Sequence, residues 1–367
     1  MQQLNKSSRF FADCHVFDGH FQGTTTYLQG LYTELIKDKS KTFFLAAHDT
    51  QHLEEIFGLH ENVVYLKYKS KNKFIRLLFE IPRLIKKNKI QYAHFQYIVP
   101  PVKCCKYIVT IHDILFLDYP QYFPLAYKIK NNFLFKISAY YSDIVLTVSE
   151  FSKQRIIKHY KTPNITVTPN GVEDFYFEAY DKTAVAQKVK ALFGVDNYWL
   201  YVSRWEPRKN HLTLLKTFVE KGYYKDNQLV FVGAKAIKNK TYDEYYNALP
   251  AEIQKRIVTL HNINREQLLD LTRAAALSAY PSVAEGFGIP PLESVAAQVP
   301  TICSNATAMG DFGFLGNCLF DPFDTTGIHD AAIHALTGKD IARQRKIVKE
   351  KYSWKIAAHA FMNAVEQ

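Results

Sequence analysis

The sequence predicts an α/β protein made of two doubly wound parallel sheets, and three observations support this. Short apolar runs of strand length alternate with amphipathic segments of helical period along the chain. Glycine turns and polar residues follow several of these runs, where the strands of a parallel sheet end and ligands bind. The chain has 367 residues, which is long for one hydrophobic core and suits two domains.

The first predicted unit is a strand, a glycine turn and a helix. Residues 9–18 read as a buried strand that leads into a loop, and a helix with Tyr27 and Leu31 on its apolar side begins at Gly23. A doubly wound sheet begins in this way, although the turn lacks the G-x-G-x-x-G dinucleotide fingerprint. The turn alone is equally consistent with a plain helix N-terminus capped by Thr24 or Thr25.

A basic amphipathic segment follows predicted strands at 42–47 and 63–65. Residues 67–89 contain nine Lys and Arg but only one acid, Glu80, and Pro82 is expected to kink the helix. One interpretation is a surface that touches anionic phospholipid or a lipid-pyrophosphate acceptor. The other is a helix packed on the sheet with a solvated basic face. Flotation on liposomes with and without anionic lipid separates them, because equal or absent flotation removes the membrane interpretation.

Residues 91–101 are expected to form a strand and then a loop, and further strands are expected at 107–113 and 143–149. The strand 107–113 ends in His112 and Asp113. Polar residues at the carboxyl ends of strands face the ligand crevice in open α/β sheets, so His112 is a candidate site residue. The structural alternative is a strand-end histidine bonded to nearby backbone.

The second domain begins with the strand 198–203, after an expected linker at 173–195. Arg204 and Lys209 follow this strand directly, before the next helix. A diphosphate needs fixed positive charge, which a forked guanidinium and a compact ammonium supply without a metal. Arg208, between them, is expected to be surface-exposed.

Residues 280–300, YPSVAEGFGIPPLESVAAQVP, carry the most specific signal. They read as a strand end, a glycine loop and a helix with proline in its first turn. Glycines allow close backbone approach to a ligand, and a helix N-terminus offers free N–H donors. Glu285 in the loop and Glu293 in the helix are eight residues apart, so both carboxylates are expected to face one cleft.

The string EGFGIPPLES with its E-x7-E spacing resembles the nucleotide-sugar-binding motif of family 4 glycosyltransferases, which are retaining enzymes with a GT-B fold. The segments IHDILFLDYPQYFP, TVSEFSKQRI, PNGV and SRWEPRKNHLTLL are similar to other parts of that family, and the resemblance spans nearly the full chain. It implies two Rossmann-like domains that face each other across a cleft. The acceptor-side domain would cover 1–175, the nucleotide-sugar domain 176–345, and a helix in 346–367 would cross back to the first.

The resemblance also implies a reaction and its residues. A hexose would move from a nucleoside-diphosphate sugar to a hydroxyl of a growing glycan in cell-surface polysaccharide assembly. Arg204 and Lys209 would neutralise the departing diphosphate, and His112 and Glu285 would lie near the transferred sugar. The implied donor-binding set is Gly23, Arg204, Lys209, Glu285, Gly286, Phe287, Gly288, Ile289 and Glu293. No metal and no cofactor beside the donor is expected.

Other readings of the function stay open. The segment around His112 favours GDP-mannose as the donor, but UDP-sugars fit the same fold. A nucleotide-sugar epimerase or hydrolase would consume the donor without an acceptor. A non-enzyme would use its basic first half to hold membrane or nucleic acid, although no helix-turn-helix, RNA-recognition motif or zinc finger is present.

The charge and the cysteine content limit which partners and which compartment suit the protein. Residues 1–170 contain 23 Lys and Arg against 13 Asp and Glu, whereas the remainder is nearly balanced, so an anionic partner is expected on the first half. The five cysteines form no C-x-x-C pair and suit a reducing compartment. With no apolar signal core at its start, the protein is expected in the cytoplasm, with peripheral contact to the inner face of the membrane.

Overall fold

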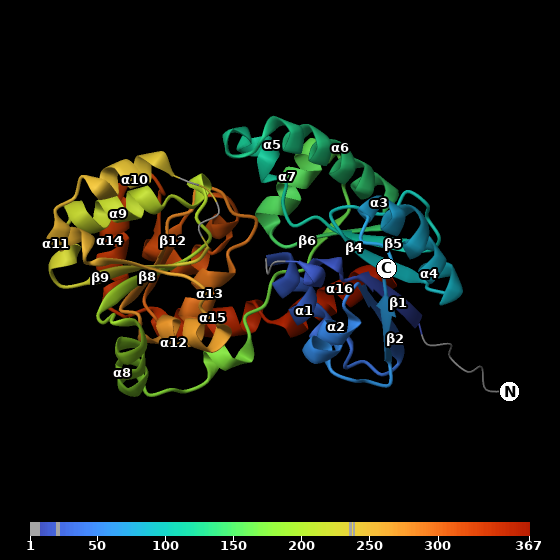
Figure 1. The fold of residues 1–367 in the computed structure, drawn as a ribbon, viewed down its shortest axis with the longest axis horizontal. Helices are drawn as coiled ribbons and strands as arrows, with labels where there is room; N and C mark the ends of the chain where they lie inside the picture. Colours follow the sequence, from blue (N-terminus) through green and yellow to red (C-terminus); the bar gives the residue numbers. More distant parts are fainter. Residues whose placement is uncertain (1–7, 20–22, 235–236, 238) are drawn as a thin grey trace. The chain divides into compact units, whose positions relative to one another are not determined.

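The computed structural model describes residues 8–19, 23–234, 237 and 239–367. The chain divides into two compact units, shown in Figure 1: Met1–Gly171 together with Trp354–Gln367, and Val172–Ser353. The first unit is therefore discontinuous in sequence, because its last helix follows the whole second unit. The boundary after Gly171 lies four residues before the expected end of the first domain at 175.

The first unit contains a seven-stranded parallel sheet within the described residues, in the order β3-β2-β1-β4-β5-β6-β7. Its strands are β1 (Ser8–Asp13), β2 (Lys41–Ala47), β3 (Val63–Lys67), β4 (Tyr92–Gln96), β5 (Lys106–Thr110), β6 (Ile144–Thr147) and β7 (Ile165–Val167). The strand order reverses between β1 and β4, which pair directly. Such a switch point is where an open α/β sheet leaves a crevice for ligands.

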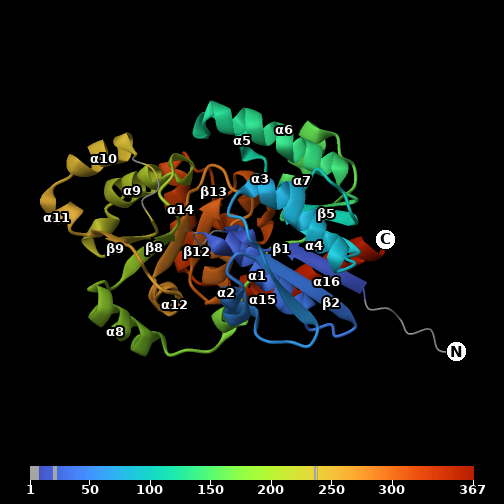
Figure 2. The same cartoon turned by 45° about the vertical axis from the view of Figure 1, so that its right-hand side comes forward.

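Helices cover both faces of this sheet, as Figures 1 and 2 show. One face carries α1 (Gly23–Leu35), α2 (Thr50–Phe57) and α16 (Trp354–Glu366). The other carries α3 (Lys73–Ile75), α4 (Ile81–Lys87), α5 (Leu115–Asp118), α6 (Leu125–Tyr141) and α7 (Glu150–Tyr160). Helices α1 and α16 pack so closely that a Cβ on Gly30 would lie 2.0 Å from the Trp354 ring. Glycine is therefore required at this crossing.

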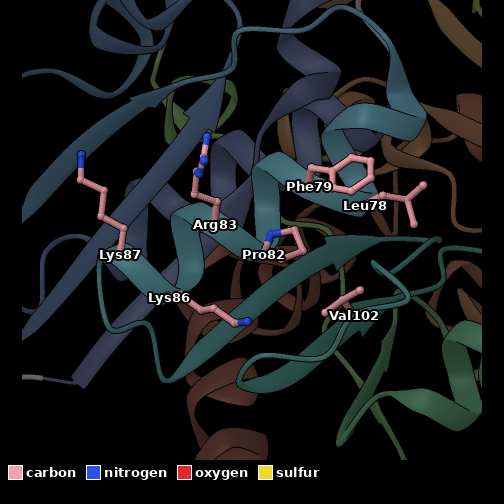
Figure 3. Close-up of a pocket in the computed structure, with 7 residues that line it drawn as sticks. All are labelled: Leu78, Phe79, Pro82, Arg83, Lys86, Lys87 and Val102. Carbon is pink, nitrogen blue, oxygen red and sulfur yellow. The ribbon is translucent and has the colours of Figure 1, made fainter.

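The basic segment 67–89 contains one unbroken helical stretch, residues 73–87, with a π-helical turn inside it. This turn (Arg76–Glu80) lies between α3 and α4, and the Ile81 N–H bonds to the Arg76 carbonyl. Pro82 lies just after the turn (Figure 3), and Glu80 before it keeps helical dihedral angles (φ −71°, ψ −50°), so the proline lies within the stretch and not at a free helix N-terminus. Arg76 is buried and lies 3.7 Å from Asp13, so this cation is directed into the unit.

The second unit contains a six-stranded parallel sheet within the described residues, in the order β10-β9-β8-β11-β12-β13. Its strands are β8 (Tyr198–Val202), β9 (Gln228–Val232), β10 (Ile257–Leu260), β11 (Leu277–Tyr280), β12 (Thr301–Ser304) and β13 (Leu319–Phe320). Here β8 and β11 are the paired strands at the switch point. The two segments predicted to bind the donor therefore leave the sheet side by side.

The helices of the second unit are α8 (Lys182–Phe193), α9 (His211–Glu220), α10 (Lys240–Asn247), α11 (Ala251–Gln254), α12 (Arg265–Ala274), α13 (Ile289–Ala296), α14 (Thr325–Leu336) and α15 (Ile341–Lys351). The prediction of a linker at 173–195 was wrong, because most of this range is α8, packed against α12. Asp181 caps the helix by accepting from the Thr183 and Ala184 N–H groups, and Gly194 ends it with φ 69°.

Candidate functional site

The loops that follow β8 and β11 bind each other at the switch point of the second sheet. The Val283 N–H donates to the Arg208 carbonyl at 2.8 Å, and the Arg208 guanidinium donates to the Ala284 carbonyl at 2.6 Å. The Tyr201 hydroxyl, on β8, donates to the Lys209 carbonyl at 2.7 Å. These bonds hold the Arg208–Lys209 and Ala284–Glu285 segments in register.

Glu285 and Lys209, both predicted as site residues, form an ion pair at the centre of these loops. Arg208 Nη1 lies 3.2 Å from Glu285 Oε2, and Arg208 also binds Glu206 at 2.8 Å. The prediction that Arg208 is surface-exposed was therefore wrong. A 3-10 turn, Pro207–Lys209, directs two consecutive cations at one carboxylate, and only 14% of the Arg208 side chain is exposed.

The charges of this cluster stabilise one another. Burial alone would raise the pKa of Glu285, but Lys209 and Arg208 lower it to about 2. Burial lowers the pKa of Lys209, and Glu285 opposes that shift. We take both groups as ionised at neutral pH, because the carboxylate has two cations in contact with it. Arg204, Arg208 and Lys209 stand against the two carboxylates of Glu206 and Glu285, so three positive charges minus two negative charges leave the cluster with a net charge of about +1 at the end of β8.

Arg204 lies at the edge of the same loop. Its side chain is more exposed to solvent than that of Lys209, the other site residue predicted in this loop. The Arg204 side chain is 55% exposed and lies 2.9 Å from Glu206 Oε1. Glu206 thus accepts from Arg204 on one oxygen and from Arg208 on the other. An exposed guanidinium held by one carboxylate keeps donor groups for an anion that approaches from solvent.

Glu293, in the second turn of α13, has a different environment. Burial raises its pKa to about 7, and a hydrogen bond from the Tyr176 hydroxyl partly offsets this shift. Glu173 raises the pKa further, and Arg265 lowers it. Its surroundings therefore favour the neutral acid, unlike those of Glu285. Tyr176 was missed by the sequence analysis, because it lies in the range expected to be a linker and no local pattern connects it to Glu293.

The glycine loop before α13 is shaped by close packing. Gly288 has φ 110°, and a Cβ there would lie 2.9 Å from Met309 Cγ, so the position requires glycine. Phe287 is buried with its ring edge-on to Phe312, at 5.8 Å between centroids. Gly286 precedes it in the loop, and Ile289 is the first residue of α13. The donor-binding residues predicted in this stretch thus form one turn at the helix start.

In the first unit, His112 follows β5 and is buried. Its Nε2 lies 2.7 Å from Gln96 Oε1, and burial lowers its pKa to about 3. The ring is therefore neutral, and its Nε2–H donates to Gln96. Tyr27 packs edge-on against it, with 4.9 Å between ring centroids. Gly23 is the first residue of α1, one turn before Tyr27, and a Cβ on it would meet no atom within 4 Å.

A buried polar network that the sequence analysis missed continues from His112. The Gln96 amide lies 3.1 Å from His94 Nε2, which also lies 2.8 Å from the Thr110 hydroxyl, and Tyr32 bonds to His94 Nδ1 at 3.1 Å. His94 and Gln96 are two apart on β4, so they share one face of the strand. The alternation of His94 and Gln96 along the strand could have been read from the sequence. Their hydrogen-bond network reaches His112 through the Gln96 side chain and holds the imidazole in place.

Lys235, whose charge in a basic loop makes it a further candidate for contact with the donor, lies outside the described residues. Across the described part of the chain, no group of three or more His, Cys, Asp or Glu side chains has the geometry of a metal site. None of the helices in that part combines the length and apolarity needed to cross a bilayer.

Two family models match the chain in succession. Glycosyltransferase Family 4 matches residues 21–174, and Glycosyl transferases group 1 matches residues 183–354. The O-antigen chain mannosyltransferase B of Escherichia coli is 28% identical over 70% of this chain and 69% of its own length. The O-antigen chain mannosyltransferase RfbU of Salmonella typhimurium is 28% identical, over 54% of this chain and 51% of its own length. The chain thus aligns with only about half of the latter.

Solved structures share the fold over nearly the whole chain. A glycosyltransferase from Rickettsia africae has a TM-score of 0.73 at 17% identity, covering 97% of each chain. Anabaena Alr3699/HepE in complex with UDP-glucose has a TM-score of 0.73 at 13% identity, covering 98% of this chain and all of that one. The predicted fold class of two doubly wound Rossmann-like domains is thereby confirmed. The chain belongs to the group 1 glycosyltransferases, with a family 4 N-terminal domain and a GT-B fold.

Proposed function

We propose that this glycosyltransferase moves mannose from GDP-mannose to a hydroxyl of a growing cell-surface glycan, with retention at the anomeric carbon. The observation that carries the proposal is the cationic cluster of Lys209 and Arg208 around Glu285, placed at the sheet's switch point. The names of the relatives support mannose and O-antigen assembly. The choice of GDP as the nucleotide of the donor is tested directly by thermal denaturation with three nucleotides.

The chemical difficulty is the departure of a diphosphate. The bond between the sugar C1 and the diphosphate oxygen breaks, and its electron pair leaves with the diphosphate. The acceptor oxygen bonds to C1 on the same face, and its proton passes to the departing phosphate oxygen. Arg204 and Lys209 would stabilise the charge that develops on the diphosphate, which is the kind of electrostatic contribution that dominates such reactions.

The two carboxylates of the loop and helix would take different parts. Glu293, whose surroundings favour the neutral acid, would bind the ribose hydroxyls, and donor binding would satisfy its oxygens. Glu285 is held by two cations and would position them and the sugar end of the donor rather than act as a nucleophile. His112, neutral because of burial, would hold a sugar hydroxyl rather than donate a proton as an imidazolium.

The acceptor would be presented at the cytoplasmic face of a membrane. Within residues 67–89, Arg76 is buried and Glu80 accepts from the Lys69 N–H at 2.9 Å, while the remaining Lys and Arg side chains are exposed. These exposed cations would approach an anionic membrane surface or a lipid-linked acceptor.

Thermal denaturation with GDP, UDP, ADP or no nucleotide tests the donor. At a hundredfold excess over its Kd, the correct nucleotide should add about 2.7 kcal/mol to the stability of the wild type. The shift should be lost in Glu293→Ala and kept in Glu252→Ala, a control at an exposed carboxylate of the same unit. A shift with UDP alone would replace the GDP assignment, and no shift with any nucleotide would contradict the donor site.

Measuring nucleotide release with and without an acceptor then distinguishes sugar transfer from hydrolysis or epimerisation of the donor. Release of the nucleotide from GDP-mannose should require an acceptor glycan. Equal release without an acceptor would indicate a hydrolase or an epimerase instead.

A further inference from the structure

Strands β4 and β5 of the first unit direct four buried polar side chains to one face of the sheet. β4 carries His94 and Gln96, and β5 ends at Thr110, two residues before His112. Gln96 and Thr110 are partners in the parallel register, so these side chains alternate onto the same face. Bonds to α1 and a ring contact with α16 show that this face is the one those two helices cover.

The backbone directly after β4 is strained. Tyr97 has φ 61°, in the left-handed region that a bulky side chain rarely adopts. The Ile98 N–H donates to the Gln96 carbonyl at 2.7 Å, which closes a tight turn around Tyr97. Strained turns persist where the surrounding structure depends on the geometry they impose. Here the turn brings the Gln96 side chain and the Tyr97 ring against the same neighbour, His112.

The His112 ring is held by three side chains. The ring of Tyr27 lies edge-on at 4.9 Å between centroids, and that of Tyr97 lies at 5.2 Å. Gln96 Oε1 lies 2.7 Å from His112 Nε2. Among the described residues, no hydrogen bond reaches the other ring nitrogen, Nδ1. The imidazole is thus fixed in orientation, with one nitrogen left for a ligand.

The Gln96 amide decides which ring nitrogen carries the proton. Its oxygen faces His112 Nε2, and its nitrogen lies 3.1 Å from His94 Nε2. An amide oxygen only accepts hydrogen bonds, whereas an amide nitrogen only donates them. In the neutral rings, His112 therefore carries its proton on Nε2 and His94 carries its proton on Nδ1. This arrangement leaves His112 Nδ1 as a hydrogen-bond acceptor.

The rest of the network follows the same direction. His94 Nδ1–H donates to the Tyr32 hydroxyl at 3.1 Å, and His94 Nε2 accepts from the Thr110 hydroxyl at 2.8 Å. Thr110 in turn accepts from the Tyr27 hydroxyl at 3.3 Å. Burial lowers the pKa of both His94 and His112 to about 3, so neither ring carries a second proton near neutral pH. The network thus ends at the unprotonated Nδ1 of His112.

We propose that Gln96 is a positioning residue that makes His112 a hydrogen-bond acceptor toward the transferred sugar. The proposal rests on the function proposed above, in which His112 holds a sugar hydroxyl. That hydroxyl donates to Nδ1. A carboxylate, a phosphate ester or a fluorine in its place has no proton to donate and meets the nitrogen lone pair directly. The first unit therefore selects a sugar with a free hydroxyl at this position.

Nitrogen-15 NMR of the histidine side chains tests the tautomer on the free protein. Near pH 7, wild-type His112 should show a protonated Nε2 and an unprotonated Nδ1, and His94 should show the reverse. The His112 signals are identified by their absence from His112→Gln. Gln96→Met keeps the length of the side chain but removes the amide, so His112 should then show a mixture of both tautomers.

Thr110→Val is the matched control. It removes a hydroxyl that bonds to His94 in the same network but leaves the bond between Gln96 and His112 in place. Each variant loses buried hydrogen bonds, so a general loss of stability affects both. Only Gln96→Met should change the tautomer of His112. A wild-type His112 that carries its proton on Nδ1, or an unchanged tautomer in Gln96→Met, would overturn the proposal.

Turnover of fluorinated donors tests the effect on selectivity. GDP-mannose is compared with analogues that carry fluorine in place of the hydroxyl at C3, C4 or C6, or with the UDP series if UDP is the nucleotide that binds. In the wild type and in Thr110→Val, one analogue should have a kcat/KM about tenfold below that of the others, since it lacks the donor to Nδ1. In Gln96→Met this difference should largely disappear, because the ring can then present Nδ1–H.

The two proposals fail in different ways. Absence of sugar transfer, or of any nucleotide-induced shift in melting temperature, would refute the donor assignment, while the NMR spectra would still decide the role of Gln96 in the free protein. Transfer with the expected tautomer but with equal turnover of all three analogues would show that His112 does not contact the sugar. Equal discrimination by the wild type and Gln96→Met would show that Gln96 does not set the selectivity.

Discussion

Glu285 and Glu293 are eight residues apart in one loop-and-helix stretch, yet their surroundings act on them in opposite directions. Two cations lower the pKa of Glu285 to about 2, while burial beside the Tyr176 hydroxyl raises that of Glu293 to about 7. Lys209 contacts Glu285, whereas the partner of Glu293 is neutral. The difference shows that equal residue types at a recognisable spacing receive their chemistry from neighbours far away in the sequence.

The comparison also distinguishes a carboxylate that stabilises the fold from one that is suited to binding a ligand. The Glu285 carboxylate is bound by two cations of the protein, so its removal should mainly lower the free energy of unfolding. The Glu293 carboxylate is destabilised in its ionised form by burial, as is typical of ionisable groups at functional sites.

Glu285→Gln should have the largest effect. The variant leaves Arg208 and Lys209 close together without their shared anion, and we expect a loss of about 3–5 kcal/mol in the free energy of unfolding at pH 7. Because the pKa of Glu285 is lowered in the folded state, its contribution is present above pH 4.5 and is lost as the pH falls toward 2. Urea denaturation of wild type and variant between pH 3 and 7 measures both features.

A matched variant sharpens this test. Glu285→Gln/Lys209→Met should cost less than the sum of the two single substitutions, since the two groups contact each other. Additive losses would contradict the coupling.

Glu293→Gln should have a smaller effect with the opposite sign. The raised pKa means that the folded state loses stability relative to the unfolded state as the pH rises from 4.5 through 7. The amide removes that loss, so the variant should be close to the wild type near pH 4.5 and exceed it by about 3 kcal/mol at pH 8, since each pKa unit of the shift corresponds to about 1.4 kcal/mol. Glu252→Gln serves as the exposed control. A stability difference that does not change with pH would remove the contrast between the two carboxylates.

Arg204→Ala should have the smallest effect on stability. With 55% of the side chain exposed, we expect the free energy of unfolding to change by no more than about 0.5 kcal/mol. Turnover should nevertheless fall about a hundredfold if the guanidinium stabilises the leaving diphosphate. Arg256→Ala, at an exposed arginine of the same unit, controls for charge. Full turnover in Arg204→Ala would exclude this residue from the site.

The sequence was most informative where a motif coincides with a strand end. Lys209 and Glu285 were both predicted as site residues and the structure places them in contact, because β8 and β11 pair and their following loops meet. The doubly wound fold was readable for a similar reason, since apolar runs and helical periods mark parallel strands and their crossovers. These features depend on local pattern and on topology rules.

The errors and omissions have a different origin. Arg208 was wrongly predicted to be exposed. The conformation of the three-residue turn Pro207–Lys209 decides which way its side chain points, and the sequence has no periodic pattern from which that conformation could be predicted. The segment 173–195 was read as a linker although Asp181 and Gly194 are suitable helix caps. The bond between Tyr176 and Glu293 joins residues over a hundred positions apart, and only the folded chain reveals it.

The packing of Trp354 over Gly30 has a consequence for how the protein is made. Strands β1–β7 leave the ribosome first, but the face of α1 that receives α16 stays uncovered until residues 172–353 have been translated, which takes roughly 10–40 s at ordinary elongation rates. During that interval Tyr27 and Tyr32 line an unfinished surface, next to the polar network that supports His112. The first domain to be synthesised is thus the last to be completed, and a nascent chain that stops before Trp354 leaves this face of α1 uncovered.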